Sequence, residues 1–289
     1  MKIKKKLLLL VFLMMSGRQV CAQSPTPDFV DVEYARASGV SLKLDIYLPK
    51  NVAKPYPVVV WIHGDRWLGG SKEEATAAFM TPTGYAVVSI NYRLSHQALF
   101  PAQIYDCKAA IRWIRANAAK YGFKAQQIGA WGSSAGGHLA ALLGVTSDVD
   151  SLEGRVGGNL QFSSRVQAVC DWFGPTNFLT LGNYPSDIDH NSPTSPEALL
   201  IGGAIPANPA KARAASPIIY VSKGDAPFLI MHGTLDMSIP FQQSVEMDSA
   251  LRAAGVVSIF KPVIGAGHGA DRFSVDSTRQ TVPHFLTGI

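Results

Sequence analysis

The pattern of apolar and polar residues divides the chain into a short alternating part and a longer part of uninterrupted apolar runs. Residues 30–34 and 42–48 alternate apolar and polar side chains, which predicts two half-exposed antiparallel strands. The later runs are continuously apolar, which is typical of parallel strands covered on both faces. These runs are residues 58–62, 85–90, 127–131, 166–170, 228–231 and 256–260.

Stretches with helical periodicity lie between the apolar runs. The clearest covers Pro101 to Tyr121, with proline in its first turn and Gly122 after its end. Strand alternating with helix predicts a doubly wound, mostly parallel sheet with antiparallel N-terminal strands, in one domain over residues 29–289. The other predicted helices are Ser71 to Met80, Ser134 to Val145 and Phe241 to Ala254.

Residues 175–217 interrupt this alternation. They are rich in Pro, Ser, Asn and Gly and show little periodicity. We expect an insertion above the sheet, a lid built of short helices.

The first 22 residues have the organisation of a signal peptide. A basic stretch, Lys2 to Lys6, precedes the short apolar run Leu7 to Met15, and Val20-Cys21-Ala22 fits a cleavage site after Ala22. The apolar run is too short for a lasting transmembrane helix. Residues 23–28 then form a linker, and the mature protein is expected in the periplasm or outside the cell. A lipoprotein acylated at Cys21 and an uncleaved membrane anchor are the alternatives.

Removal of this segment changes the meaning of the net charge. The whole chain carries +5, but the first 22 residues hold five basic and no acidic residues, so the mature chain is neutral. Neutrality gives no electrostatic support for a nucleic-acid partner or an anionic membrane. The mature chain keeps Cys107 and Cys170, each in an apolar context that favours buried free thiols over a disulfide.

The main chemical motif is Gly132-Ser133-Ser134-Ala135-Gly136. It has the form G-x-S-x-G, between a predicted strand and a predicted helix, and its frame selects Ser134. Such a sharp turn presents the serine hydroxyl at the carboxyl edge of a sheet. The motif also arises by chance in Gly- and Ser-rich loops, but the flanking strand and helix favour a nucleophile.

A serine nucleophile needs a base to take its proton and an acid to orient that base. His268 lies between glycines after the last predicted strand, where no apolar face surrounds it, whereas His284 lies in a helical tail. Asp236 follows the strand 228–231 and is the expected acid, with Asp171 as the runner-up.

Other residues at the predicted edge have auxiliary roles. We expect the backbone N–H of Ala135, with Asp65 and Arg66 in the loop after residues 58–62, to form an oxyanion hole. Trp67 and Trp172 are candidates for stacking on substrate, with core packing as the alternative. His63, His138 and His232 are expected to be structural, and neither a metal-binding spacing nor a cofactor motif is present.

Taken together, these motifs resemble one family of α/β-hydrolases, the bacterial esterases that include bifunctional acetyl-xylan and feruloyl esterases (BD-FAE-like). The resemblance implies the α/β-hydrolase fold, ester hydrolysis without metal or organic cofactor, Ser134 as nucleophile, Asp236 as acid and His268 as base. It rests on residues 57–64, 91–94, 106–113, 132–138, 171–175, the Asp236 segment and 267–269.

One segment departs from that family. The chain has His63-Gly64-Asp65-Arg66-Trp67 where the family usually has H-G-G-G-W or H-G-G-A-W. Glycine is suited to unusual dihedral angles, and a carboxylate near a developing oxyanion is unfavourable. We favour a tolerated loop variant. The alternatives are altered catalysis and an arginine that contacts an acidic substrate group such as a uronate.

These features predict an exported serine carboxylic-ester hydrolase. By resemblance, its substrates are small-molecule or oligosaccharide esters that carry acetyl or hydroxycinnamoyl groups from plant polysaccharide. The alternatives are a small-peptide serine peptidase and a non-catalytic binding protein with this fold.

Overall fold

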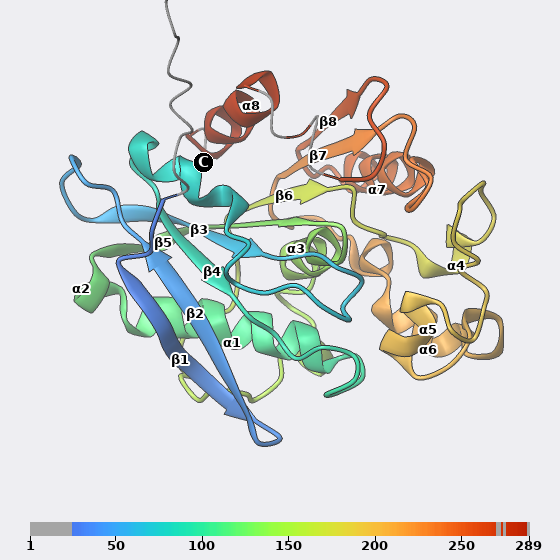
Figure 1. Cartoon of the computed structure of the whole chain (residues 1–289), viewed down its shortest axis with the longest axis horizontal. Coiled ribbons are helices and arrows are strands. Elements are labelled where there is room, and N and C mark those ends of the chain that lie inside the picture. The colour runs from blue at the N-terminus through green and yellow to red at the C-terminus, as the bar shows by residue number, and fades with distance from the viewer. Residues whose placement is uncertain (1–24, 270–272, 274–275, 288–289) are drawn as a thin grey trace, which may run out of the picture.

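A computed structural model describes residues 25–269, 273 and 276–287 (Figure 1). The predicted signal peptide, residues 1–22, and the first residues of the predicted linker lie outside the described residues. No helix in the described part of the chain is long and apolar enough to span a membrane.

The core of the protein is an eight-stranded sheet with the order β1-β2-β4-β3-β5-β6-β7-β8. β1 pairs with β2, and β2 with β4, in antiparallel fashion, and every later pair is parallel. This confirms the predicted mostly parallel sheet with antiparallel N-terminal strands. The strands are β1 Phe29–Ala37, β2 Val40–Tyr47, β3 Tyr56–Ile62, β4 Ala86–Ile90, β5 Phe123–Ser133, β6 Ala168–Trp172, β7 Phe228–Gly233 and β8 Ser258–Val263.

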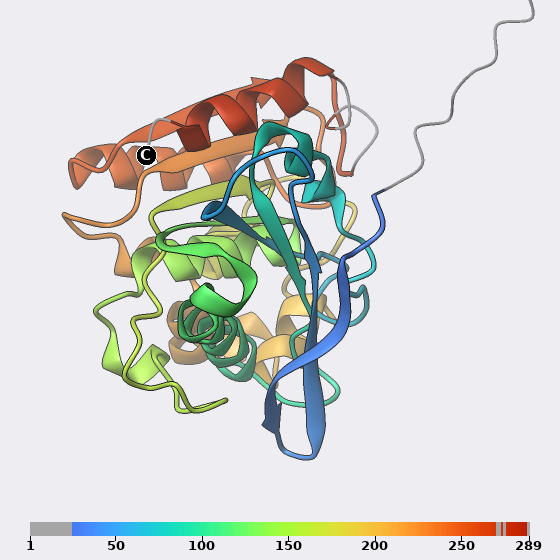
Figure 2. The ribbon, with the colours of Figure 1, turned by 90° about the vertical axis from the view of Figure 1, so that its left-hand side faces the viewer.

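Helices cover both faces of this sheet (Figures 1 and 2). α1 (Ala102–Ala116), α3 (Ala135–Val145) and α7 (Gln242–Ala253) contribute to one apolar cluster. The 3-10 helix η1 (Thr76–Thr83) and α8 (Asp276–Thr287) contribute to the cluster on the other face. The central strands are therefore buried on both sides, which explains their uninterrupted apolar sequences.

Two predicted helices differ from the observed ones. The helix predicted from Ser71 is instead η1, which begins at Thr76, because tertiary contacts hold Lys72: its N–H donates to Asn91, and its ammonium group lies 2.9 Å from the buried Asp45 carboxylate. The long helix predicted to Tyr121 divides into α1 and α2 (Ala118–Tyr121). The amide of Asn117 donates to the carbonyl of Trp113 at the break.

The segment between β6 and β7 contains the predicted short helices. They are α4 (Phe178–Leu181), α5 (Pro196–Ile201), α6 (Pro209–Ala215) and two 3-10 helices, η3 (Ile205–Ala207) and η4 (Pro217–Tyr220). α5 has a complete set of end signals, because Ser195 Oγ accepts a hydrogen bond from the N–H of Ala198 and Gly202 ends the helix. Figure 1 shows α4, α5 and α6 beyond the carboxyl ends of the parallel strands.

A buried ion pair joins the sheet to α1. The Arg93 guanidinium donates two hydrogen bonds to the Asp106 carboxylate, at 2.8 and 2.7 Å. Burial raises the pKa of Asp106 despite the opposing effect of Arg93. Cys107, the next residue, and Cys170 are both buried free thiols.

Candidate active site

Ser134 lies in a strained turn between β5 and α3. Its backbone angles are φ 55° and ψ −120°, an uncommon conformation for a residue other than glycine. The flanking glycines are required by close packing. A β-carbon on Gly132 would lie 2.2 Å from the carbonyl oxygen of Gly136, and one on Gly136 would lie 2.0 Å from that of Ile62. The sequence motif therefore corresponds to a turn that only small residues allow.

The structure brings Ser134, His268 and Asp236 together at the carboxyl ends of β5, β7 and β8. The Ser134 hydroxyl lies 3.0 Å from His268 Nε2, and His268 Nδ1 lies 2.7 Å from Asp236 Oδ2. An ionised Asp236 accepts a hydrogen bond from the Nδ1–H group of His268, which leaves Nε2 free to accept the proton of the serine hydroxyl. The runner-up residues do not join this arrangement.

Asp236 is held by several donors. Its Oδ1 accepts hydrogen bonds from the backbone N–H groups of Ser238 and Ile239, at 2.8 and 2.9 Å. Its Oδ2 lies 3.2 Å from His232 Nε2 as well as near His268. Burial opposes ionisation, but the hydrogen bonds from His232 and His268 outweigh it and hold the pKa of Asp236 below its usual range. The carboxylate is therefore fixed in position and charged.

Asp171, the alternative acid, lies elsewhere in the fold. Its Oδ1 accepts a hydrogen bond from the N–H of Gly174 at 2.9 Å, and burial raises the pKa of its carboxyl group to about 7. His284, the alternative base, is exposed on α8.

The loop after β3 has an unusual backbone. Asp65, Arg66 and Trp67 are consecutive residues with φ of 69°, 59° and 57°, in the left-handed region that favours glycine. The side chains of Asp65 and Arg66 are exposed, and Asp65 Oδ2 turns back over Gly69, 2.2 Å from where a β-carbon on that glycine would lie. The loop thus keeps the backbone shape that a glycine sequence adopts without strain.

The predicted oxyanion residues border the nucleophile. Arg66 and Ala135 line one hollow beside Ser134, and Asp65 and Arg66 line another. Among the described residues, the backbone N–H groups of Ala135, Asp65 and Arg66 donate no hydrogen bond to another backbone carbonyl outside regular structure. The oxyanion role of these three residues stays a prediction.

The two tryptophans proposed to stack on substrate are packed in the core instead. Trp67 and Trp172 are each only 2% exposed. The ring of Trp67 packs on His138 and Phe178, and the ring of Trp172 packs edge-on against Trp131. Both residues border a hollow near Ser134, but neither offers an open face for stacking, because neighbouring rings cover it.

The two hollows beside Ser134 differ strongly in size. The open one has a volume of about 390 Å³ and includes Asp65, Arg66, Glu74 and Phe173 in its walls. The small one has a volume of about 30 Å³ and is lined by apolar side chains, among them Ile188 and Pro196 of the insertion, together with the polar Arg66, Glu197, Ser238 and His268. Both hollows include Ser134 and His268, so a substrate bound at the serine can extend in two directions.

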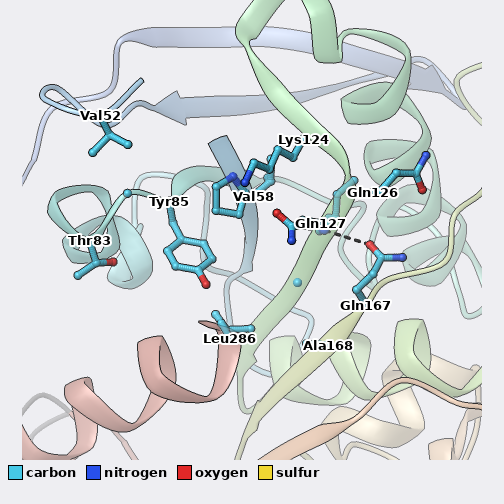
Figure 3. A pocket seen from close by; sticks show the side chains of 14 residues that line it. Val52, Val58, Thr83, Tyr85, Lys124, Gln126, Gln127, Gln167, Ala168 and Leu286 are labelled. Atoms are coloured by element: carbon cyan, nitrogen blue, oxygen red, sulfur yellow. Dashed lines mark hydrogen bonds between the residues drawn. The ribbon is translucent and has the colours of Figure 1, made fainter. Parts of the chain in front are cut away.

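A larger hollow of about 610 Å³ lies at the opposite end of the sheet, where β3, β5 and β6 begin (Figure 3). Tyr85, Lys124, Gln127 and Leu286 are among the residues around it. Figure 3 also shows the side-chain oxygen of Gln167, which accepts a hydrogen bond from the N–H of Ile128. None of its lining residues belongs to the Ser134 arrangement, so the hollow is separate from the candidate active site.

Two further histidines contact the site although sequence reasoning assigned them no such role. His232 was expected to be structural, and it contacts the acid Asp236 directly. His190 was not singled out, and it pairs with the buried Glu197 next to the small hollow. Both contacts join residues that are close in sequence, His232 with Asp236 at a separation of four and His190 with Glu197 at a separation of seven, but no sequence motif marks either pair. No cluster suited to a metal ion occurs among the described residues.

The fold and this arrangement define the class of protein. A mostly parallel sheet with a serine on the turn after β5, an acid after β7 and a histidine after β8 is the serine-type α/β-hydrolase architecture. The match to the BD-FAE family model over residues 44–251 makes the chain a member of that family.

Solved structures of esterases are similar over nearly the whole chain. A truncated carbohydrate esterase from gut microbiota is 36% identical, with a TM-score of 0.83, and the match covers 92% of this chain and 96% of that one. A bifunctional GH43-CE protein of Bacteroides eggerthii is 40% identical, with a TM-score of 0.83, over 90% of this chain and 38% of that one.

The mycobacterial relatives are longer proteins. Esterase LipC of Mycobacterium tuberculosis is 31% identical over 239 residues, which cover 79% of this chain and 57% of LipC. Esterase LipQ of the same organism is 31% identical over 83% of this chain and 56% of its own length. The chain thus spans little more than half the length of these relatives. LipC, LipQ and the gut-microbiota structure are all described as esterases.

Proposed function

We propose that the protein is an exported serine carboxylesterase that removes acetyl or hydroxycinnamoyl groups from plant polysaccharide or its fragments. The observation that carries the proposal is the hydrogen-bonded series Ser134, His268 and Asp236. Membership of the BD-FAE family and the similarity to carbohydrate esterases support the substrate class. Export is supported by the signal-peptide pattern of residues 1–22.

In this proposal the reaction proceeds through an acyl-enzyme. Ser134 Oγ bonds to the ester carbonyl carbon while its proton passes to His268 Nε2. The negative charge on the carbonyl oxygen is stabilised by the backbone N–H groups of Ala135 and of the loop containing Asp65 and Arg66. The bond to the alcohol then breaks, and His268 gives its proton to the leaving oxygen.

Hydrolysis of the acyl-enzyme repeats the same steps with water. His268 takes a proton from water, the hydroxyl oxygen bonds to the acyl carbon, and the bond to Ser134 breaks as the proton returns to the serine. Asp236 remains ionised throughout and stabilises the imidazolium of His268 in both halves of the cycle.

The proposal is tested with p-nitrophenyl acetate and the variant Ser134→Ala. We expect the mature protein to release p-nitrophenol and the variant to lose at least about 10³-fold in kcat, because it lacks the nucleophile. Circular dichroism of both proteins verifies that they are folded. Equal rates for the two proteins would contradict the proposal. A folded but inactive wild-type protein would favour a non-catalytic binding role, and the strained Asp65-Arg66 loop would then be the first segment to vary.

A further inference from the structure

Two hollows of very different size meet at Ser134, and their sizes determine which part of a substrate each can hold. A saccharide ring does not fit in a space of about 30 Å³, whereas the open hollow of about 390 Å³ accommodates one. A sugar ester bound at Ser134 must therefore place its saccharide in the open hollow and its acyl group in the small one. We propose that the small hollow is an acyl pocket that admits acetyl and excludes hydroxycinnamoyl groups. This inference rests on the proposed function and narrows it.

The volume of the pocket limits the size of the acyl group that it can hold. A site for one water molecule needs about 10–15 Å³ of such volume, so about 30 Å³ holds the methyl group of an acetyl ester and little more. A hydroxycinnamoyl group adds an aromatic ring that has no space there. The apolar walls are Trp67, Pro175, Ile188, Pro196 and Ile239.

The wall formed by Ile188 and Pro196 of the insertion is held in place by a chain of hydrogen bonds with a buried pair at its centre. His190 Nδ1 lies 3.1 Å from the Glu197 carboxylate, and both side chains are essentially unexposed, at 0% and 1%. His190 Nε2 donates to the backbone carbonyl of Ser238 at 3.1 Å. Ile188 and Pro196 border the pocket from the same stretch of the insertion. The Glu197–His190 pair therefore ties this stretch to the loop that immediately follows Asp236.

Further contacts tie the same two segments together. The N–H of Asp187 donates to the carbonyl of Met237 at 2.7 Å, and Ser186 Oγ donates to that carbonyl at 2.9 Å. The N–H of Ile188 donates to Ser186 Oγ at 3.1 Å. Because these bonds flank Ile188 on both sides, the pocket cannot enlarge on this side without breaking several hydrogen bonds, of which the His190–Glu197 bond is fully buried.

The test uses p-nitrophenyl esters of acetate, propionate, butyrate and hexanoate, which vary the acyl chain and keep the leaving group constant. For the wild-type protein we expect kcat/KM to fall at least about tenfold from acetate to butyrate, since the pocket is full after one methyl group. For Ile188→Ala we expect the ratio of butyrate to acetate to rise about tenfold. Leu199→Ala, an exposed leucine of the same insertion, is the matched control and should leave the ratio unchanged.

A second variant tests the positioning role of the buried pair. Glu197→Gln disturbs the bond to His190, and we expect a raised butyrate-to-acetate ratio, seen as a lower KM for butyrate with kcat for acetate reduced less than threefold. On an acetylated and feruloylated xylo-oligosaccharide, the wild-type protein should release acetate and no ferulate.

The outcomes separate the two proposals. Equal kcat/KM for acetate and butyrate, release of ferulate, or an unchanged ratio in Ile188→Ala would overturn the acyl pocket while hydrolysis by Ser134 stands. Absence of any hydrolysis that depends on Ser134 would overturn the proposed function and the pocket with it.

Discussion

At the residue scale, the most unusual feature is the backbone of Asp65, Arg66 and Trp67. All three have positive φ, and only the aspartate belongs to the residue types that tolerate this region well. The strain therefore lies beside the nucleophile, because Asp65 and Arg66 line the same hollow as Ser134.

We predict that Arg66→Gly stabilises the folded protein. Glycine relieves the strain of a left-handed arginine, about 1–2 kcal/mol, although it also adds freedom to the unfolded chain at a cost of about 0.5–1 kcal/mol, so the expected net gain is about 0.5–1 kcal/mol. Urea denaturation measures the free energy of unfolding. Arg213→Gly, an arginine in α6, is the control and should cost about 1 kcal/mol. A lower stability of Arg66→Gly would show that the guanidinium makes stabilising interactions in solution.

At the element scale, α3 is anchored at its start by more than the serine turn. His138, in the first turn of α3, donates from Nε2 to the carbonyl of Ala215 at the end of α6, at 2.7 Å. Its ring lies between Trp67 and Phe178. Burial lowers the pKa of His138 to about 4, so the ring is neutral in the folded protein at pH 7. This contact links the helix after the nucleophile to the insertion.

The titration of His138 predicts a pH dependence of stability. The unfolded chain takes up this proton near pH 6.5 and the folded chain only near pH 4, so the unfolded state binds more protons in between. The free energy of unfolding should fall as the pH drops from 6.5 to 4, by up to about 3 kcal/mol from this residue. His138→Gln keeps a hydrogen-bond donor without the titration.

The measurement is urea denaturation of wild type and His138→Gln at several pH values between 7 and 4. The variant should lose less stability over this range than the wild-type protein. His63, whose pKa burial also lowers to about 4, remains in both proteins and contributes equally. Parallel curves for the two proteins would rule out His138 as a source of the slope.

At the scale of the whole molecule, the sheet and its helices are joined by buried ionic contacts as well as by apolar packing. Asp106 is fully buried and Arg93 is 6% exposed, and the pair connects the segment after β4 to α1. An isolated charge in such a place costs far more than the pair contributes. The pair therefore acts as a constraint on how α1 docks on the sheet.

We predict that Asp106→Ala lowers the free energy of unfolding by about 3–5 kcal/mol, because it leaves the Arg93 guanidinium buried without its partner. The double variant Arg93→Met with Asp106→Leu removes both charges and should recover at least half of that loss. Thermal and urea denaturation of the three proteins provide the comparison. A double variant as unstable as the single one would show that the pair contributes chiefly through its attraction.

Most of the sheet was predictable from the sequence, because a strand that is buried on both faces must be apolar throughout. Local patterns predicted the strands formed by the apolar runs and the serine turn between Gly132 and Gly136. The residues at which helices begin and end were harder to predict. Asn117 divides α1 from α2, and Lys72 prevents a helix from Ser71, through contacts with residues that local periodicity does not include.

The site divides in the same way. Local sequence alone determined the serine turn, the glycines on either side of His268 and the position of Asp236 shortly after β7, because each depends on neighbours within a few positions. Tertiary structure decided that Asp236, and not Asp171, contacts His268, that Trp67 and Trp172 are covered, and that Glu197 and His190 close the small hollow. Those outcomes depend on which strand ends and loops meet in space, and that is determined by the packing of the whole sheet.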